Sequence, residues 1–263
     1  MVHLHLNFFI MLRDQIRDKN YFEKIIFEKE TSNQTWLAKC NIGEVKEDRI
    51  PFVRRNLSWT YLTIISAKYS AGYCIENLLA DWKEGIKLIH ESWDGFWKLK
   101  QGNPPVEYDQ YILSAYDEML WMLSLGYLLD AQAQDFKKLV EVIDRDKVKD
   151  NLFEFIISAK LKDRAPIQEE SYREFFGVPE TFAKLRESID EPDKAKAEKL
   201  IHDFLKRDWY KNHKDAGWYN SHKSKHDTYF GYWSFESAAV VKIKGLDDTS
   251  FRDNQYYPKA FML

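Results

Sequence analysis

The apolar residues of this chain recur at helical spacing along almost its whole length, and this spacing constrains the fold more than any other feature. In the stretch 57–65, apolar side chains fall at positions i, i+4, i+7 and i+8, so one face of a helix carries them all. The chain holds only 10 Gly and 7 Pro, too few for the many turns of an all-β fold. No strand pair is predicted. We therefore expect an all-α, bundle-like protein of about eight to ten helices in two closely packed halves.

The other helices are predicted from similar stripes. The prolines of QGNPP at 101–105 end one of them, and Asp150 is placed to cap another. Charge density rises at 144–151 (DRDKVKDN), so we expect an N-terminal helical domain over 6–135 and a C-terminal helical domain over 136–260. The same charged run would also suit a solvated helix end. The remaining stripes lie at 75–89, 108–123, 136–143, 153–161, 182–185, 197–205 and 230–243.

Composition and charge limit the compartments in which this protein can be expected and the kinds of partner it can be expected to bind. The net charge of -3 indicates no nucleic-acid or membrane partner. Cys40 and Cys74 cannot make a disulfide framework and are typical of thiols in a reducing compartment. The opening MVHLHLNFFIMLRD lacks the basic start and the cleavage site of a signal peptide. The longest apolar stretch, Met119–Leu129, covers 11 residues, about half of what a bilayer requires. We expect a cytoplasmic protein without membrane contact.

The stretch 221–248, SHKSKHDTYFGYWSFESAAVVKIKGLDD, raises the question of a metal or catalytic site. His222 and His226 are four residues apart, Asp227 follows, and Glu236 lies inside an apolar helix. Histidines at i and i+4 on one helix face could bind a metal, and with Asp227 and Glu236 they would make a metal-assisted hydrolase. However, the stretch lacks the glutamate of an HExxH motif, and no distal third ligand follows. A structural polar network is therefore favoured, and neither a metal nor a cofactor is predicted.

Other signs of catalysis are weak. Four of the seven histidines lie between residues 202 and 226, which would suit acid/base chemistry. The same region is a polar, aromatic-rich connection in which histidines also serve as hydrogen-bonding groups. No GxSxG, P-loop, GxGxxG or paired Cys/His motif is present. We therefore do not expect an enzyme.

One charge feature points to a protein partner. From Gln101 to Phe136 the chain has no Lys or Arg, and acids alternate there with aromatic residues. Acids and aromatics on one surface suit a protein that covers the basic, nucleic-acid-binding groove of another protein. The alternative is a helix pair whose outer face happens to be acidic. The candidate binding residues are Glu107, Asp109, Tyr111, Asp117, Glu118, Asp130 and Asp135.

Three stretches resemble a known family. They are RDKNYFEK at 17–24, AKYSAGYCIENL at 67–78 and WYNSHKSKHDTYFGYWSFESAAVVKIKGLDDTSFRDNQYYP at 218–258. The first two resemble the N-terminal domain, and the long third stretch the C-terminal domain, of PoNi, the immunity proteins of polymorphic nuclease effectors. The resemblance spans nearly the whole chain.

This resemblance implies an all-helical, two-domain antitoxin without catalysis of its own. Such a protein binds a cognate DNase effector toxin and occludes its active or DNA-binding site, commonly in interbacterial competition through type VI secretion. The family motif marks no toxin-contacting residue to carry over, so the binding site rests on the charge argument, and a homodimer stays an open alternative. We expect the conspicuous motif residues to be scaffold: Tyr69, Gly72, Tyr73, His222, His226, Trp233, Glu236, Gly245 and Asp248.

Overall fold

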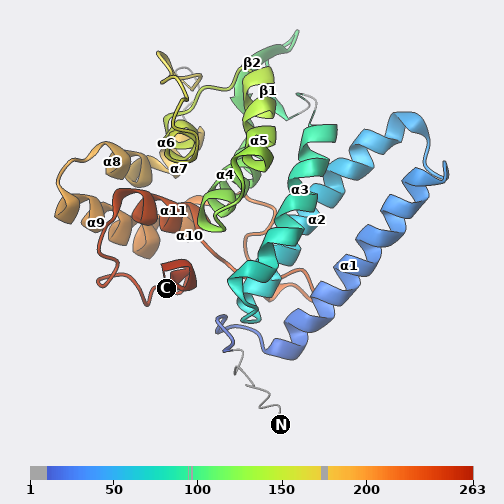
Figure 1. Cartoon of the computed structure of the whole chain (residues 1–263), viewed down its shortest axis with the longest axis horizontal. Helices are drawn as coiled ribbons and strands as arrows, with labels where there is room; N and C mark the ends of the chain where they lie inside the picture. Colours follow the sequence, from blue (N-terminus) through green and yellow to red (C-terminus); the bar gives the residue numbers. More distant parts are fainter. Residues whose placement is uncertain (1–10, 94, 96, 173–176, 263) are drawn as a thin grey trace, which may run out of the picture.

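The computed structural model describes residues 11–262 except 94, 96 and 173–176. The first ten residues, which include most of the segment judged unlike a signal peptide and the expected domain start at residue 6, lie outside the described part. The fold is mostly helical and bundle-like, as the apolar spacing predicts. Figure 1 shows the helices following one another from the blue N-terminal group to the red C-terminal group, with one small hairpin between them.

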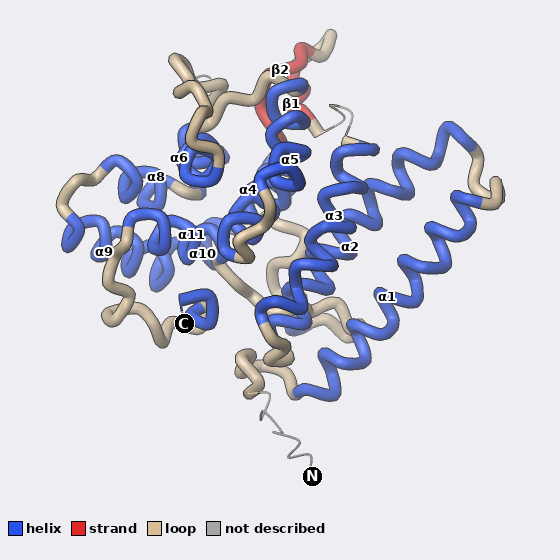
Figure 2. The backbone as a smooth tube through the Cα atoms, in the orientation of Figure 1, coloured by secondary structure: helices blue, strands red, loops and turns tan. Residues whose placement is uncertain are grey.

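The N-terminal group consists of three long helices packed side by side (Figures 1 and 2). Asp18 caps the first of them by accepting a hydrogen bond from the backbone N–H of Tyr21. Pro51 stands in the first turn of the second, where its missing N–H costs nothing. The helices are α1 (Lys19–Asn41), α2 (Ile50–Ser70) and α3 (Leu78–Ser92).

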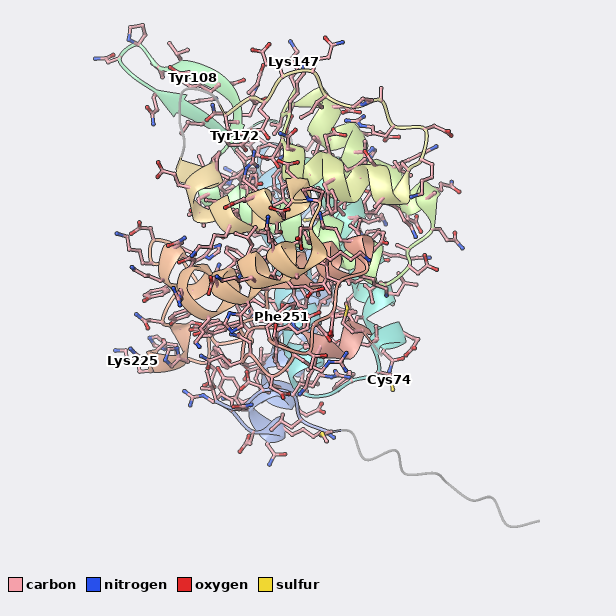
Figure 3. The ribbon with its side chains drawn as sticks, turned by 90° about the vertical axis from the view of Figure 1, so that its left-hand side faces the viewer. Cys74, Tyr108, Lys147, Tyr172, Lys225 and Phe251 are labelled. Atoms are coloured by element: carbon pink, nitrogen blue, oxygen red, sulfur yellow. The ribbon has the colours of Figure 1, made fainter. Side chains whose placement is uncertain are left out.

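A two-stranded hairpin follows, so the expectation that the chain has no strand pair was wrong, although the fold class is as predicted. Strands β1 (Lys98–Gln101) and β2 (Val106–Tyr111) pair antiparallel across the QGNPP turn, and the hairpin carrying Tyr108 projects from the body (Figure 3). The predicted helical stripe at 108–123 was therefore too long at its start. Its first positions fit two periods, because Tyr108 and Ile112 are spaced for a helix face and equally for one face of a strand.

The central helix of the fold is α4 (Leu113–Leu128). Nearly every residue of its last three turns is buried, because α2, α3, α5 (Ala133–Arg145) and α11 (Phe235–Lys244) all pack against it. A helix surrounded in this way carries apolar residues on every side and buries its polar residues too. Because of this position, the acidic residues of α4 are buried rather than exposed.

The C-terminal group is built from shorter helices on the other side of α4 (Figure 1). Asp150 caps α6 through the backbone N–H of Phe153, as predicted. A π-helical turn, Phe204–Asp208, follows the ninth helix of the chain and leads into the tenth. The shorter helices of this group are α6 (Asn151–Lys160), α7 (Gly177–Thr181), α8 (Ala183–Asp190), α9 (Lys194–Asp203) and α10 (Trp209–Asn212).

The last helix, α11, is shorter than its apolar pattern predicts. It begins at Phe235 rather than near Phe230, because Gly231 adopts a φ of 103°. A Cβ at Gly231 would lie 2.1 Å from the Ser70 hydroxyl oxygen, so this segment passes directly against the end of α2 in an extended form. At the other end Gly245, at φ 60°, closes α11 as the predicted left-handed cap.

Buried apolar side chains from both predicted halves form one continuous cluster that extends from Phe22 to Phe261. Shorter helical turns complete the connections, at Glu47–Arg49, Ile75–Asn77, Ser221–Lys223 and Lys259–Met262. Within the described residues, no helix has both the length and the apolarity that crossing a bilayer demands.

Candidate functional site

The two histidines of the stretch 221–227 do not share a helix face. His222 lies in the short turn Ser221–Lys223 and the chain then runs without regular structure as far as Ser234. The Nδ1 atom of His222 is 2.8 Å from the Tyr232 hydroxyl, whereas His226 is exposed. Asp227 pairs with Lys24 of α1 at 2.6 Å. Figure 3 shows Lys225 of this loop at the edge of the molecule. The hydrolase alternative needs His222 and His226 on one helix face, and this stretch forms no helix that spans both residues.

Glu236 lies apart from both histidines, in the first turn of α11. It is fully buried and accepts hydrogen bonds from Trp209 Nε1 at 2.5 Å and Ser234 Oγ at 2.8 Å. Burial raises the pKa of Glu236 to about 7. Among the described residues, no group of three or more His, Cys, Asp or Glu side chains is arranged to hold a metal ion. The four residues of the hydrolase alternative therefore form no common site.

A different histidine occupies a chemically distinctive position. His213 is fully buried behind α10, and its Nδ1 donates to the Trp209 carbonyl at 2.5 Å. Its Nε2 lies 3.4 Å from Oδ1 of Asp117 on α4. Burial alone would lower the pKa of His213, but the Asp117 carboxylate outweighs it and the pKa is raised. Both ring nitrogens face acceptors, which favours the doubly protonated ring.

The predicted acidic binding set is divided by the fold. Tyr111, Asp117 and Glu118 are each 1% exposed, so the expectation that they lie on an outer surface is corrected. Tyr111 donates to Asp146 at 2.8 Å. Glu118 receives both ends of the Arg55 guanidinium, at 2.8 and 2.5 Å. Asp117 and Glu118 are buried because other helices surround α4, whereas Tyr111 is buried at the end of β2.

Lysines that lie outside the stretch 101–136 pair with the remaining acids of that set. Lys98 contacts Asp109 at 2.5 Å and Glu107 at 3.1 Å across the hairpin. The other ion pairs are Asp130 with Lys160 at 2.6 Å, and Asp135 with Lys83 at 3.3 Å and Lys138 at 3.2 Å. The stretch without Lys or Arg in the sequence is therefore not a region without cations in space. Toxin binding by these four acids stays a prediction.

The first group of motif residues lies where the ends of the chain meet the end of α2. Tyr69 stacks its ring on Phe261 with centroids 5.2 Å apart, and its ring contacts Trp233 edge-on at 4.8 Å. Gly72, at φ 91°, lets the chain reverse just after α2. Tyr73 donates from its hydroxyl to Glu23 at 2.8 Å.

The second group of motif residues joins the C-terminal segment to the same place. Trp233 Nε1 donates to the Ser70 hydroxyl at 2.8 Å. Asp248 is buried and accepts from Arg252 at 2.7 Å. The Trp233 contact holds the C-terminal stretch against α2, whereas the Asp248 contact lies within that stretch.

A cleft lies beside the buried His213–Asp117 pair. It has a volume of about 460 Å³ and opens between α2, α4 and the loop that follows α10. Aromatic side chains make much of its lining: Trp59, Trp97, Trp218 and Phe230. Asp117 and Glu118 were expected on an outer face, but they are buried in the lining of this cleft. Arg55, which also lines it, carried no sequence signal.

Together, fold and site define a class: a mostly helical protein whose conspicuous polar residues make contacts within the chain and whose surface carries a cleft of about 460 Å³. Two consecutive family models match the chain, the PoNe immunity protein (PoNi) N-terminal model over residues 13–141 and the PoNi C-terminal model over residues 148–261. The chain belongs to the PoNi family of immunity proteins, as its motifs had suggested.

A solved structure shares the fold. The crystal structure of protein PA2201 from Pseudomonas aeruginosa aligns with a TM-score of 0.54 and 15% sequence identity, over 94% of this chain and 90% of that one. At this identity the likeness concerns the fold alone. No curated protein matches the sequence.

Proposed function

We propose that this protein is an antitoxin that binds a cognate nuclease toxin, a DNase, and blocks its active or DNA-binding site. The observation that carries the proposal is the match of both PoNi models, in order, over nearly the whole chain. Binding rather than catalysis also suits the site, because the histidines and carboxylates of the long C-terminal motif lie in separate structural contacts.

Inhibition by occlusion follows from what a DNase must present. A surface that binds DNA is positively charged, since it neutralises phosphates. A partner that fills or covers that surface excludes the substrate without any chemistry of its own. In this proposal the protein acts in the cytoplasm of the cell it protects, against a toxin delivered during interbacterial competition, for example by type VI secretion. It needs no cofactor and no metal.

The proposal is tested by purifying the protein together with the product of the neighbouring toxin gene and measuring DNA cleavage. We expect a stable complex in which cleavage is abolished. An unrelated DNase of similar charge is the control, and it should cleave at its normal rate in the presence of this protein. A complex that still cleaves DNA, or no complex, would refute the proposal. Light scattering of the free protein would decide whether it forms a homodimer.

A further inference from the structure

The cleft beside α4 contains a carboxylate, that of Asp117, which no donor of the described residues reaches with hydrogen-bond geometry, since His213 Nε2 stays 3.4 Å away. Neither oxygen of Asp117 accepts a hydrogen bond within the described part of the chain, although the side chain is only 1% exposed. Its charged neighbour is His213, with a closest approach of 3.4 Å. A buried carboxylate without donors is costly. A donor entering through the cleft would therefore be bound favourably.

The other carboxylates that line the cleft are already satisfied. Glu118 receives Arg55 in a bidentate contact and a further hydrogen bond from Ser58 at 3.1 Å. Asp227, at the exposed edge, is paired with Lys24. Asp117 is therefore the carboxylate of this cleft with capacity for a further donor.

The aromatic walls add a second preference for a cation. Trp59 meets Phe230 edge-on with ring centroids 5.9 Å apart, and both line the cleft with Trp97 and Trp218. The negative face of an aromatic ring attracts ammonium and guanidinium groups, and tryptophan does so best. The same cleft already shows this contact, since the Arg55 guanidinium lies 4.6 Å from the Trp97 ring centroid.

A second cation of the cleft, besides Arg55, limits what can enter. Lys29 of α1 lines the cleft. Burial lowers its pKa, and the neighbouring charge that acts on it is Glu28 rather than Asp117. An incoming cation close to Lys29 would be repelled. The cleft therefore suits one basic side chain near Asp117 rather than several basic side chains.

We propose that this cleft receives a single arginine or lysine side chain of the nuclease toxin, with Asp117 as its acceptor and the tryptophans as its walls. The inference rests on the proposed function and assigns the contact surface that function leaves open. It moves toxin recognition from an outer acidic face to an aromatic cleft with one buried acid. A DNase offers such side chains, because its DNA-binding surface is basic.

A steric variant tests the surface without altering the core. Gly217 lies exposed at the cleft, and a Cβ built there meets no atom within 4 Å. Gly217→Trp should fill the opening and raise the Kd for the toxin, measured by calorimetry, about tenfold or more. Gly217→Ala is the matched control, because it adds one carbon to open space, and it should bind as the unchanged protein does.

A second variant tests the charge. Asp117→Asn keeps the shape and removes the acceptor charge, so we expect the Kd to rise about 30-fold, the lower end for losing one partner of a buried charge pair. The melting temperature of this variant is measured alongside, because His213 then loses its carboxylate. If Asp117→Asn fails to fold, the result for Gly217→Trp decides.

The outcomes separate this inference from the proposed function. If the unchanged protein inhibits the toxin and both folded variants bind as it does, the cleft is overturned and the function stands. If Gly217→Trp loses binding while a folded Asp117→Asn variant keeps it, recognition of a basic side chain is overturned. If the unchanged protein forms no complex with the toxin, both proposals fall together.

Discussion

Glu236 places a carboxyl group in the core, and the stability of the protein should depend on pH because of it. Its folded pKa of about 7 lies above the ordinary value of 4.5, so the folded state holds the proton more tightly. The contribution is complete below pH 4.5 and is lost as the pH rises through 7. Relative to Glu236→Gln, the unchanged protein should lose about 3 kcal/mol of unfolding free energy over this range.

Chemical denaturation of both proteins between pH 4 and pH 8 provides the measurement. Comparing the two cancels the titration of other carboxyl groups, which is common to both. A difference in unfolding free energy that stays constant with pH would show that Glu236 does not titrate in this way.

The buried pair of Arg55 and Glu118 should matter far more than any exposed ion pair. Arg55→Met would leave Glu118 charged at 1% exposure and would remove the guanidinium that lies over the Trp93 and Trp97 rings. We expect a loss of about 3–5 kcal/mol in unfolding free energy. Asp130→Asn is the control, since Asp130 is highly exposed in its pair with Lys160, and it should cost less than about 1 kcal/mol. Similar losses in the two variants would contradict this ranking.

Sequence reasoning anticipated some of these residues and missed others for a physical reason. A glutamate inside an apolar helix must have partners, so the burial of Glu236 followed from its neighbours in the chain. The burial of Asp117 and Glu118 did not, because their partners come from distant segments: His213 from the loop after α10 and Arg55 from α2. A local charge pattern cannot distinguish an acidic surface from an acid that meets a distant cation.

At the scale of elements, one glycine sets how closely three helices approach. A Cβ on Gly126 of α4 would lie 2.5 Å from Trp82 of α3 and 2.8 Å from Phe136 of α5. Gly126→Ala should therefore destabilise the protein by about 1–3 kcal/mol despite the better helix propensity of alanine. Gly85→Ala is the matched control, because the nearest atom there is the flexible end of Met122 at 3.0 Å. Urea denaturation compares them, and an equal or smaller effect at Gly126 would count against this packing.

The spacing of apolar residues predicts where a helix lies better than where it begins and ends. Caps follow from local chemistry, and Asp150 and Gly245 both act as their residue types predict. The start of α11 depends instead on a tertiary contact, since Gly231 passes against Ser70 of α2. The hairpin at 98–111 was missed because its strands are short and one face fits a helical spacing equally well.

At the scale of the whole molecule, segments far apart in the chain are joined by buried and partly buried polar contacts. The Tyr229 hydroxyl donates to Asp14 at 2.5 Å, and the Arg17 guanidinium donates to the His222 carbonyl at 2.8 Å. The two residues of each contact are 215 and 205 positions apart in the sequence, so each contact joins the predicted N-terminal domain to the predicted C-terminal domain. The division at residues 135 and 136 stays a prediction, and the continuous core gives a way to examine it.

If one core serves both halves, neither half buries its apolar surface alone, and the protein should unfold in a single transition. Far-UV circular dichroism and tryptophan fluorescence should then give the same midpoint in guanidinium chloride. Tyr229→Phe removes the donor to Asp14 and should lower the free energy of unfolding by about 1–2 kcal/mol. Both midpoints should then shift together to a lower denaturant concentration. Two separate transitions, or a shift in only one signal, would mean that the halves are independent domains. In that case the cleft proposed to bind the toxin, which takes residues from α2 and from the loop after α10, would depend on how two domains meet.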